Sequence, residues 1–104
     1  MHLERVGLAI VERNYKCKVG ELDIIARDGN TLVFVEVRSR VSARFGSAID
    51  AITRAKQRQV TRVAEVYLQH KRPREARFRF DVIAITGPQL IYIRDAWRLG
   101  LLAP

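Results

Sequence analysis

The stretch Gly20–Arg40, GELDIIARDGNTLVFVEVRSR, decides the fold of this sequence. Side chains alternate over residues 21–27, which predicts a β-strand. Asp28-Gly29-Asn30 is typical of a tight turn. The return segment, residues 31–38, is apolar on both faces over most of its length, as a central buried strand is. We therefore predict an antiparallel hairpin whose second strand is buried.

Besides Asp28 of the turn, the two strands of this hairpin carry three acids, Glu21, Asp23 and Glu36. Glu21 and Asp23 lie two residues apart, so both project from one face of their strand. Glu36 sits in the apolar run of the return strand, and Arg38 points to the same side. If the pairing register brings these acids together, they need a cation between them, because like charges at that range cannot all ionise. Oxygen ligands without histidine or cysteine favour Mg²⁺ or Mn²⁺.

Two interpretations of the acids stay open on the sequence alone. In the first, Asp23 and Glu36 pair with Arg38 and Arg40 in a buried salt-bridge cluster. In the second, they hold a metal ion beside a basic surface, an arrangement that suits phosphodiester hydrolysis. Arg38, or Lys56 from the next helix, would then steady the developing charge. Arg38 cannot serve as a general base, because its guanidinium stays protonated.

The remaining elements follow from periodicity and capping residues. Thr53 is a good N-cap for a helix over residues 54–70, whose apolar residues recur at spacings of three and four. Gly7 predicts the end of a helix that we expect to lie mostly before this sequence begins. Further strands are predicted over residues 8–11, 77–85 and 90–93. A helix between groups of strands predicts an α/β domain with a mixed β-sheet and flanking helices.

The composition indicates one folded domain over residues 1–104. The 48% apolar content argues against disorder. No apolar run is long enough to span a membrane, and no signal peptide is recognisable. The lone Cys17 forms no internal disulfide and has no metal-ligand spacing. We therefore expect a cytoplasmic protein with no membrane partner.

The charge predicts a polyanionic partner. The formal net charge is +8, and fifteen of the nineteen basic residues are arginine, which suits bidentate contacts with phosphate. Nucleic acid is the expected partner, since no basic amphipathic membrane anchor stands out. We expect DNA contacts from Arg40, Arg44, Arg54, Gln57, Arg58 and Arg62.

Three segments together resemble a known family. They are the hairpin above, FGSAIDAITRAKQRQVTRVAEVYL (residues 45–68) and RFDVIAI (residues 79–85). They are similar to the YraN-like family of predicted bacterial endonucleases, which is distantly similar to archaeal Holliday-junction resolvases. This resemblance implies a restriction-endonuclease-like fold and Mg²⁺- or Mn²⁺-dependent hydrolysis of branched or structured DNA.

The superfamily motif is an acid on one strand followed by (D/E)-x-K on the next. The resemblance implies these metal ligands: Asp23, Glu36 and the main-chain carbonyl of Val37, with Glu21 as an auxiliary acid. It places Lys56 and Gln57 at the helix edge of the site. The sequence departs from the motif at Arg38, which stands where the motif has lysine. The family also has a longer N-terminal helix.

Two other functions stay open. One is a DNA-binding module with a degenerate site, in which Arg38 neutralises Asp23 and Glu36 and no metal enters. The other is an adaptor whose charge binds an acidic protein. For a nuclease that cuts two strands, a homodimer is the expected assembly.

Overall fold

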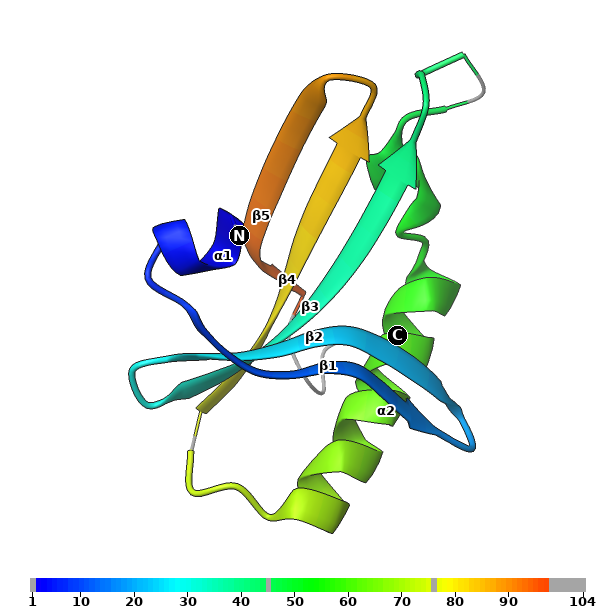
Figure 1. The fold of residues 1–104 in the computed structure, drawn as a ribbon. Coiled ribbons are helices and arrows are strands. Elements are labelled where there is room, and N and C mark those ends of the chain that lie inside the picture. Colours follow the sequence, from blue (N-terminus) through cyan, green and yellow to red (C-terminus); the bar gives the residue numbers. More distant parts are fainter. Residues whose placement is uncertain (1, 45, 76, 98–104) are drawn as a thin grey trace.

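The computed structural model of the protein describes residues 2–44, 46–75 and 77–97. Its elements are arranged as one sheet with a long helix across it (Figure 1). In chain order they are α1 (His2–Arg5), β1 (Ala9–Cys17), β2 (Gly20–Asp28), β3 (Thr31–Arg40), the 3-10 helix η1 (Ala48–Ala51), α2 (Arg54–Lys71), β4 (Arg77–Thr86) and β5 (Gln89–Trp97).

The five strands form one mixed sheet in the order β1-β2-β3-β4-β5. β3 and β4 are parallel and are joined through α2, while every other neighbouring pair is antiparallel. Parallel neighbours need such a crossover, because a tight turn can only reverse the chain. The predicted hairpin is confirmed, with Gly29 in the left-handed region at φ 59° in its turn. The α/β class expected from the sequence is confirmed, and the sheet is consistent with a restriction-endonuclease-like domain.

α2 forms where the capping and periodicity signals predict it. Thr53 is its N-cap, and the Thr53 hydroxyl accepts a 3.1 Å hydrogen bond from the Lys56 amide. The helix ends at Arg72, a left-handed C-cap with φ 44°. Neither α2 nor any other helix in the described part of the chain is long and apolar enough to cross a membrane.

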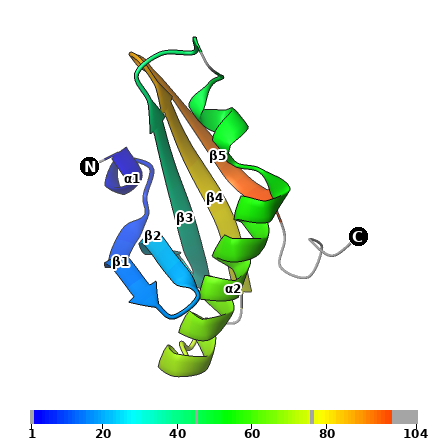
Figure 2. The ribbon, with the colours of Figure 1, turned by 90° about the vertical axis from the view of Figure 1, so that its right-hand side faces the viewer.

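The sheet buries a different apolar cluster on each face. α2 covers one face, where Phe34, Phe80 and Val63 belong to the larger cluster. On the opposite face, Leu3 of α1 packs with a smaller cluster that includes Val35. Figure 2 shows the two helices on opposite sides of the sheet. Phe34 and Val35 are neighbours with fully buried side chains, which explains why this strand is apolar on both faces.

β1 is longer than predicted. The sequence suggested extended structure only over residues 8–11, whereas β1 continues to Cys17 and pairs with β2 along its length. Most of the added residues are polar, since β1 is an edge strand with much of its surface exposed, and Asn14 has a positive φ of 54°. β5 is likewise longer than the predicted 90–93 and reaches Trp97. Half-exposed edge strands carry a weak apolar signal, which is why their extent was missed.

Candidate functional site

The pairing register of β2 and β3 brings the two central acids together. Ile24 pairs with Val35, so Asp23 and Glu36 are the next residues outward on the two strands. The Asp23 carboxylate Oδ2 accepts a 2.9 Å hydrogen bond from the main-chain amide of Val37. The side chain of Asp23 therefore ties the two strands where their regular pairing ends.

Glu36 is a buried acid with unusual surroundings. Its side chain is 2% exposed, and its Oε2 lies 2.8 Å from Arg38 Nη2 and 3.4 Å from Lys56 Nζ. Neither contact has hydrogen-bond geometry, so Glu36 Oε2 is left as a buried side-chain oxygen without a hydrogen bond. In the described parts of the chain it is the only such side-chain atom. Most buried polar atoms are satisfied, so this one calls for an explanation.

The charges of Arg38 and Lys56 do not fully offset the cost of ionising the buried Glu36 carboxyl group. Burial, followed by the adjacent Asp23 carboxylate, raises the pKa of Glu36 to about 7 from its ordinary value of 4.5. The positive charges of Lys56 and Arg38 oppose this rise. When protonated, Glu36 shares a hydrogen bond with Asp23. At neutral pH the carboxyl pair thus needs either a proton or a further cation.

A hollow of about 510 Å³ opens onto this pair. Its lining comes from the β1–β2 turn region, from β2 and β3, and from the first turns of α2. The lining residues are Lys16, Cys17, Gly20, Glu21, Asp23, Glu36, Arg38, Lys56 and Gln59. The four residues predicted to act in catalysis, Asp23, Glu36, Arg38 and Lys56, therefore meet in one place.

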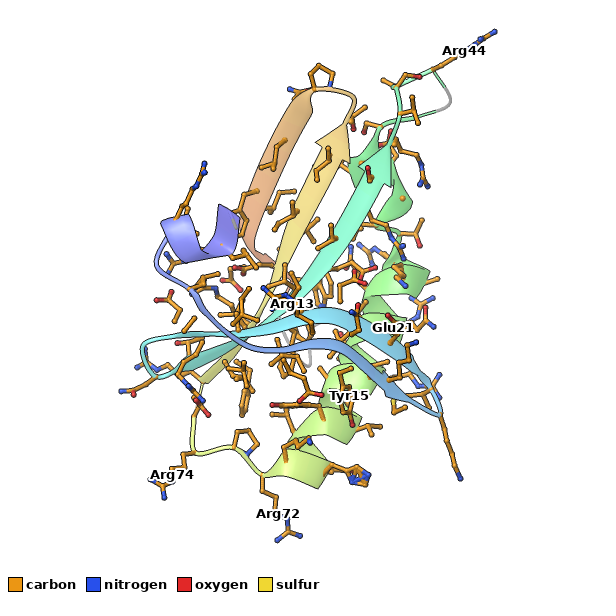
Figure 3. The ribbon with its side chains drawn as sticks, viewed as in Figure 1. Arg13, Tyr15, Glu21, Arg44, Arg72 and Arg74 are labelled. Atoms are coloured by element: carbon orange, nitrogen blue, oxygen red, sulfur yellow. The ribbon has the colours of Figure 1, made fainter. Side chains whose placement is uncertain are left out.

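Glu21 stays at the edge of this hollow. It lines the hollow but is exposed, on the part of β2 that passes α2 (Figure 3). Among the described residues, no three acid, histidine or cysteine side chains come close enough to hold a metal ion. The geometry thus provides two carboxylates, Asp23 and Glu36, and leaves the third acid of the hairpin apart.

The glutamine in the hollow is Gln59, which the sequence did not single out as a site residue. The Gln59 Oε1 accepts a 3.5 Å hydrogen bond from Lys56 Nζ. Gln57, which the resemblance placed at the helix edge of the site, instead donates its side-chain amide to the Ile52 carbonyl at 3.3 Å. Successive side chains on a helix are rotated by about 100°, so Gln57 and Gln59, two positions apart, point to nearly opposite sides of α2.

Gly20 explains how α2 approaches so closely. A Cβ at this position would lie 3.0 Å from Val63 Cγ2 and 3.1 Å from Gln59 Nε2, and its φ is +150°. Only glycine fits without movement of these neighbours. Its place before the hairpin acids was visible in the sequence, but the contact with α2 was not.

The five arginines predicted to contact DNA are exposed but spread out, whereas Gln57 is half-buried. Arg54, Arg58 and Arg62 are exposed along α2. Arg40 is exposed at the end of β3, and Arg44 lies at the tip of the following loop, well away from Glu21 (Figure 3). Their role in DNA binding stays a prediction.

A second buried acid, Asp81, belongs to a separate structural network. Its carboxylate accepts hydrogen bonds from Arg79 at 3.0 and 3.2 Å, from the Asp95 amide at 2.9 Å, and from the Tyr92 hydroxyl. Arg79 also donates to Asp28 at 2.7 Å. Asp81 is therefore fully satisfied, in contrast to Glu36, and has no vacancy for a ligand.

Comparison with known sequences gives one consistent result. The sequence model of the uncharacterised protein family UPF0102 matches residues 1–85. A UPF0102 protein from Caldicellulosiruptor saccharolyticus is 48% identical over 80% of this chain and 70% of its own length. One from Geotalea daltonii is 47% identical over 94% of this chain and 81% of its own, and one from Geobacter metallireducens is 46% identical over 95% and 84%. The resemblance to the YraN-like family is confirmed by these matches.

Proposed function

This chain belongs to the uncharacterised protein family UPF0102, and we propose that it is a metal-dependent endonuclease that hydrolyses phosphodiester bonds in structured DNA. The observation that carries the proposal is the buried Glu36 Oε2, which has no hydrogen bond and lies beside a second carboxylate. The family name states no activity, so the support comes from this site and from the charge of the chain.

The donor set fits a hard divalent cation. Asp23 and Glu36 offer carboxylate oxygens, and no nitrogen or sulfur ligand except Cys17 lines the hollow. Such oxygens suit Mg²⁺ or Mn²⁺, which retain water molecules and so need few protein ligands. Asp23 and Glu36 would hold the ion, with the main-chain carbonyl of Val37 as the third ligand implied by the resemblance. A bound Mg²⁺ supplies Lewis acidity toward a phosphoryl oxygen and lowers the pKa of a coordinated water.

The chain's own cations bind and orient the phosphate. Arg38 is 32% exposed and Lys56 is 23% exposed, so both reach from buried Glu36 toward the open side of the hollow. They can donate hydrogen bonds to the oxygens of a phosphodiester and stabilise the charge that develops on them. Gln59, through its contact with Lys56 Nζ, keeps that ammonium group near the carboxyl pair.

The test is cleavage of branched DNA with Mg²⁺ or Mn²⁺, together with calorimetric metal titration. We expect both Asp23→Asn and Glu36→Gln to abolish metal binding and cleavage, because each removes one of two charged ligands. Arg38→Lys restores the residue type of the motif and is expected to raise the cleavage rate. Glu65→Gln is the matched control, since it removes an exposed carboxylate from α2, outside the hollow. Cleavage that survives Asp23→Asn, or metal binding that does not depend on Asp23 and Glu36, would contradict the proposal.

A separate observation supports a second candidate function. Arg38 and Lys56 already lie near the same Glu36 oxygen, at 2.8 and 3.4 Å, where a metal ion would bind. If they substitute for the ion, the protein is a DNA-binding module with a degenerate site. This function predicts salt-dependent DNA affinity without metal binding or cleavage in the wild type.

A further inference from the structure

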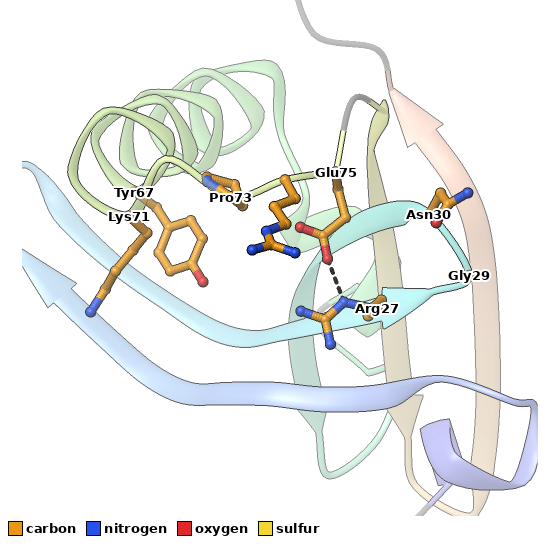
Figure 4. A pocket seen from close by; sticks show the side chains of 8 residues that line it. Arg27, Gly29, Asn30, Tyr67, Lys71, Pro73 and Glu75 are labelled. Carbon is orange, nitrogen blue, oxygen red and sulfur yellow. Dashed lines mark hydrogen bonds and ion pairs between the residues drawn. The ribbon is translucent and has the colours of Figure 1, made fainter.

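A second hollow, of about 710 Å³, lies at the other end of α2 (Figure 4). It is enclosed by the last turn of α2, the segment Pro73–Glu75, and the β2–β3 turn. The charged and hydroxyl-bearing side chains that line it are Arg27, Tyr67, Lys71, Arg74 and Glu75. None of these residues lines the candidate metal site.

The hollow carries a positive charge. Lys71 and Arg74 are exposed, and neither has an acidic partner within ion-pair distance among the described residues. Glu75 is the one acid in the lining, and it pairs with Arg27. The acid is therefore matched within the hollow, and the two exposed cations are left as the net charge.

Arg27 and Tyr67 add donors that are already held in place. Arg27 gives only its Nε to Glu75, and its two terminal nitrogens have no hydrogen bond to any described residue. The Tyr67 side chain is 4% exposed and is fixed by edge contacts with Tyr15 and Phe34, at centroid distances of 5.1 and 5.9 Å. Its hydroxyl is directed into the hollow and has no hydrogen-bond partner in the described part of the chain (Figure 4).

The Tyr67 hydroxyl is a donor throughout the neutral range. Burial, followed by the negative charges of Glu12 and Glu75, raises the pKa of Tyr67 above its ordinary value. A protonated hydroxyl, a guanidinium with free N–H groups and two further cations form a group of donors, and the one carboxylate in the lining, Glu75, is already paired with Arg27. This is the chemistry that recognises the oxygens of a phosphate group.

The hollow is connected to the candidate metal site through shared residues. A third hollow, of about 680 Å³, lies between the β1–β2 hairpin and the end of α2. It shares Lys71 with the hollow of about 710 Å³, and it shares Lys16 and Cys17 with the hollow at the candidate metal site. Lys18 and His70 also line it. The three hollows therefore adjoin one another through these shared residues, and each has a lysine in its lining.

The spacing along α2 suits a nucleic-acid strand. Lys56 and Lys71 are fifteen residues apart, which at a rise of ~1.5 Å per residue places them roughly 22 Å apart along the helix axis. At ~3.4 Å per nucleotide, a strand covers that length in about six or seven steps. One strand can thus reach both ends of the helix.

We propose that the hollow of Arg27, Tyr67, Lys71 and Arg74 is a subsite for a backbone phosphate of DNA. The same DNA strand would place another of its phosphates at the candidate metal site. This assignment rests on the proposed function, because it names the same nucleic acid as ligand. It gives Lys71 and Arg74 a binding role, and it positions DNA without reading its sequence.

The test measures the binding of a fluorescently labelled four-way DNA junction by anisotropy, in EDTA and over a range of salt concentrations. Lys71→Gln is expected to weaken binding roughly five- to tenfold and to lower the log–log salt slope by about 0.9. Tyr67→Phe is expected to weaken binding about threefold with the slope and the melting temperature unchanged, since it removes an uncharged donor with no internal partner. Arg72→Gln is the matched control, because Arg72 is exposed next to Lys71 yet lines none of the three hollows.

The outcomes separate this subsite from the nuclease itself. Weaker binding in Lys71→Gln and Tyr67→Phe but not in Arg72→Gln supports the subsite even if the wild type never cleaves DNA. Equal affinities and equal salt slopes for all four proteins overturn it, even if the wild type does cleave. Stabilisation of the wild type, but not of Lys71→Gln, by inorganic phosphate, with DNA affinity unchanged, would assign the hollow to a free phosphate and overturn the DNA assignment.

Discussion

The sharpest consequence of the site is that Glu36 destabilises the metal-free protein when it ionises. The change we would make is Glu36→Gln, which keeps the size of the side chain and mimics the protonated acid. If Glu36 were instead a stabilising member of a salt-bridge cluster with Arg38 and Lys56, the same change would destabilise the fold. The two interpretations therefore predict effects of opposite sign.

The magnitude follows from the pKa of Glu36, which is raised from 4.5 to about 7. One pKa unit corresponds to about 1.4 kcal/mol, so ionised Glu36 costs the fold about 3 kcal/mol at pH 8. Below pH 4.5 the acid is protonated in both the folded and the unfolded state and contributes nothing. Between pH 4.5 and 7 the folded state binds more protons than the unfolded state, so stability falls as the pH rises. Above pH 7 the penalty is complete.

The assay is urea unfolding of wild type and Glu36→Gln in EDTA at pH 5 and at pH 8. We expect Glu36→Gln to be more stable by about 3 kcal/mol at pH 8, equivalent to a melting temperature higher by on the order of 10 °C. The difference should shrink toward zero at pH 5. Adding Mn²⁺ should stabilise the wild type and leave Glu36→Gln unchanged, since only the ionised pair binds the ion.

The exposed Glu65 of α2 provides the control, and Glu65→Gln should stay within about 0.5 kcal/mol of wild type at both pH values. The reasoning is refuted if Glu36→Gln is less stable than wild type at pH 8. It is also refuted if the difference between the two proteins is the same at pH 5 and pH 8, because the pKa of Glu36 would then not be raised.

Two further predictions concern the scaffold. Asp81→Asn should destabilise the protein by roughly 3 kcal/mol in urea unfolding, because it leaves the half-buried Arg79 without the carboxylate that accepts two of its hydrogen bonds. A loss below about 1 kcal/mol would show that Asp28, the other carboxylate on Arg79, compensates alone. Gly20→Ala should lower the free energy of unfolding by about 2–3 kcal/mol, since the new Cβ meets Val63 at 3.0 Å. Gly29→Ala should lower it by only about 1 kcal/mol, because its Cβ meets nothing within 4 Å and only the positive φ is strained. Equal losses in the two variants would argue against the close approach of α2.

Much of the scaffold of the site could be predicted from local patterns. The hairpin followed from alternation and from the Asp28-Gly29-Asn30 turn, and α2 followed from Thr53 and its apolar spacing. These signals are local, because strand and helix periods and caps depend only on residues close in sequence. The lengths of β1 and β5 were underestimated, since edge strands expose polar residues that break the pattern.

The contacts between separate helices and strands could not be predicted from such local patterns. Gln57 and Gln59 both lie near the start of α2, and only the phase of α2 relative to β2 decides that Gln59 faces the hollow while Gln57 donates to the Ile52 carbonyl. The basic segment after α2 was visible in the sequence, but its enclosure with Tyr67 and Arg27 depends on how α2 lies across the sheet.

The sequence by itself determined that this protein has acids on neighbouring strands of a basic α/β domain. It did not determine whether those acids meet, because a register shift of one residue would send them to opposite faces of the sheet. The tertiary structure decided that Asp23 and Glu36 meet and that Glu21 stays apart. It also decided that Arg38 and Lys56 approach Glu36 without satisfying its buried oxygen, since hydrogen-bond geometry is set by the packing of three separate elements.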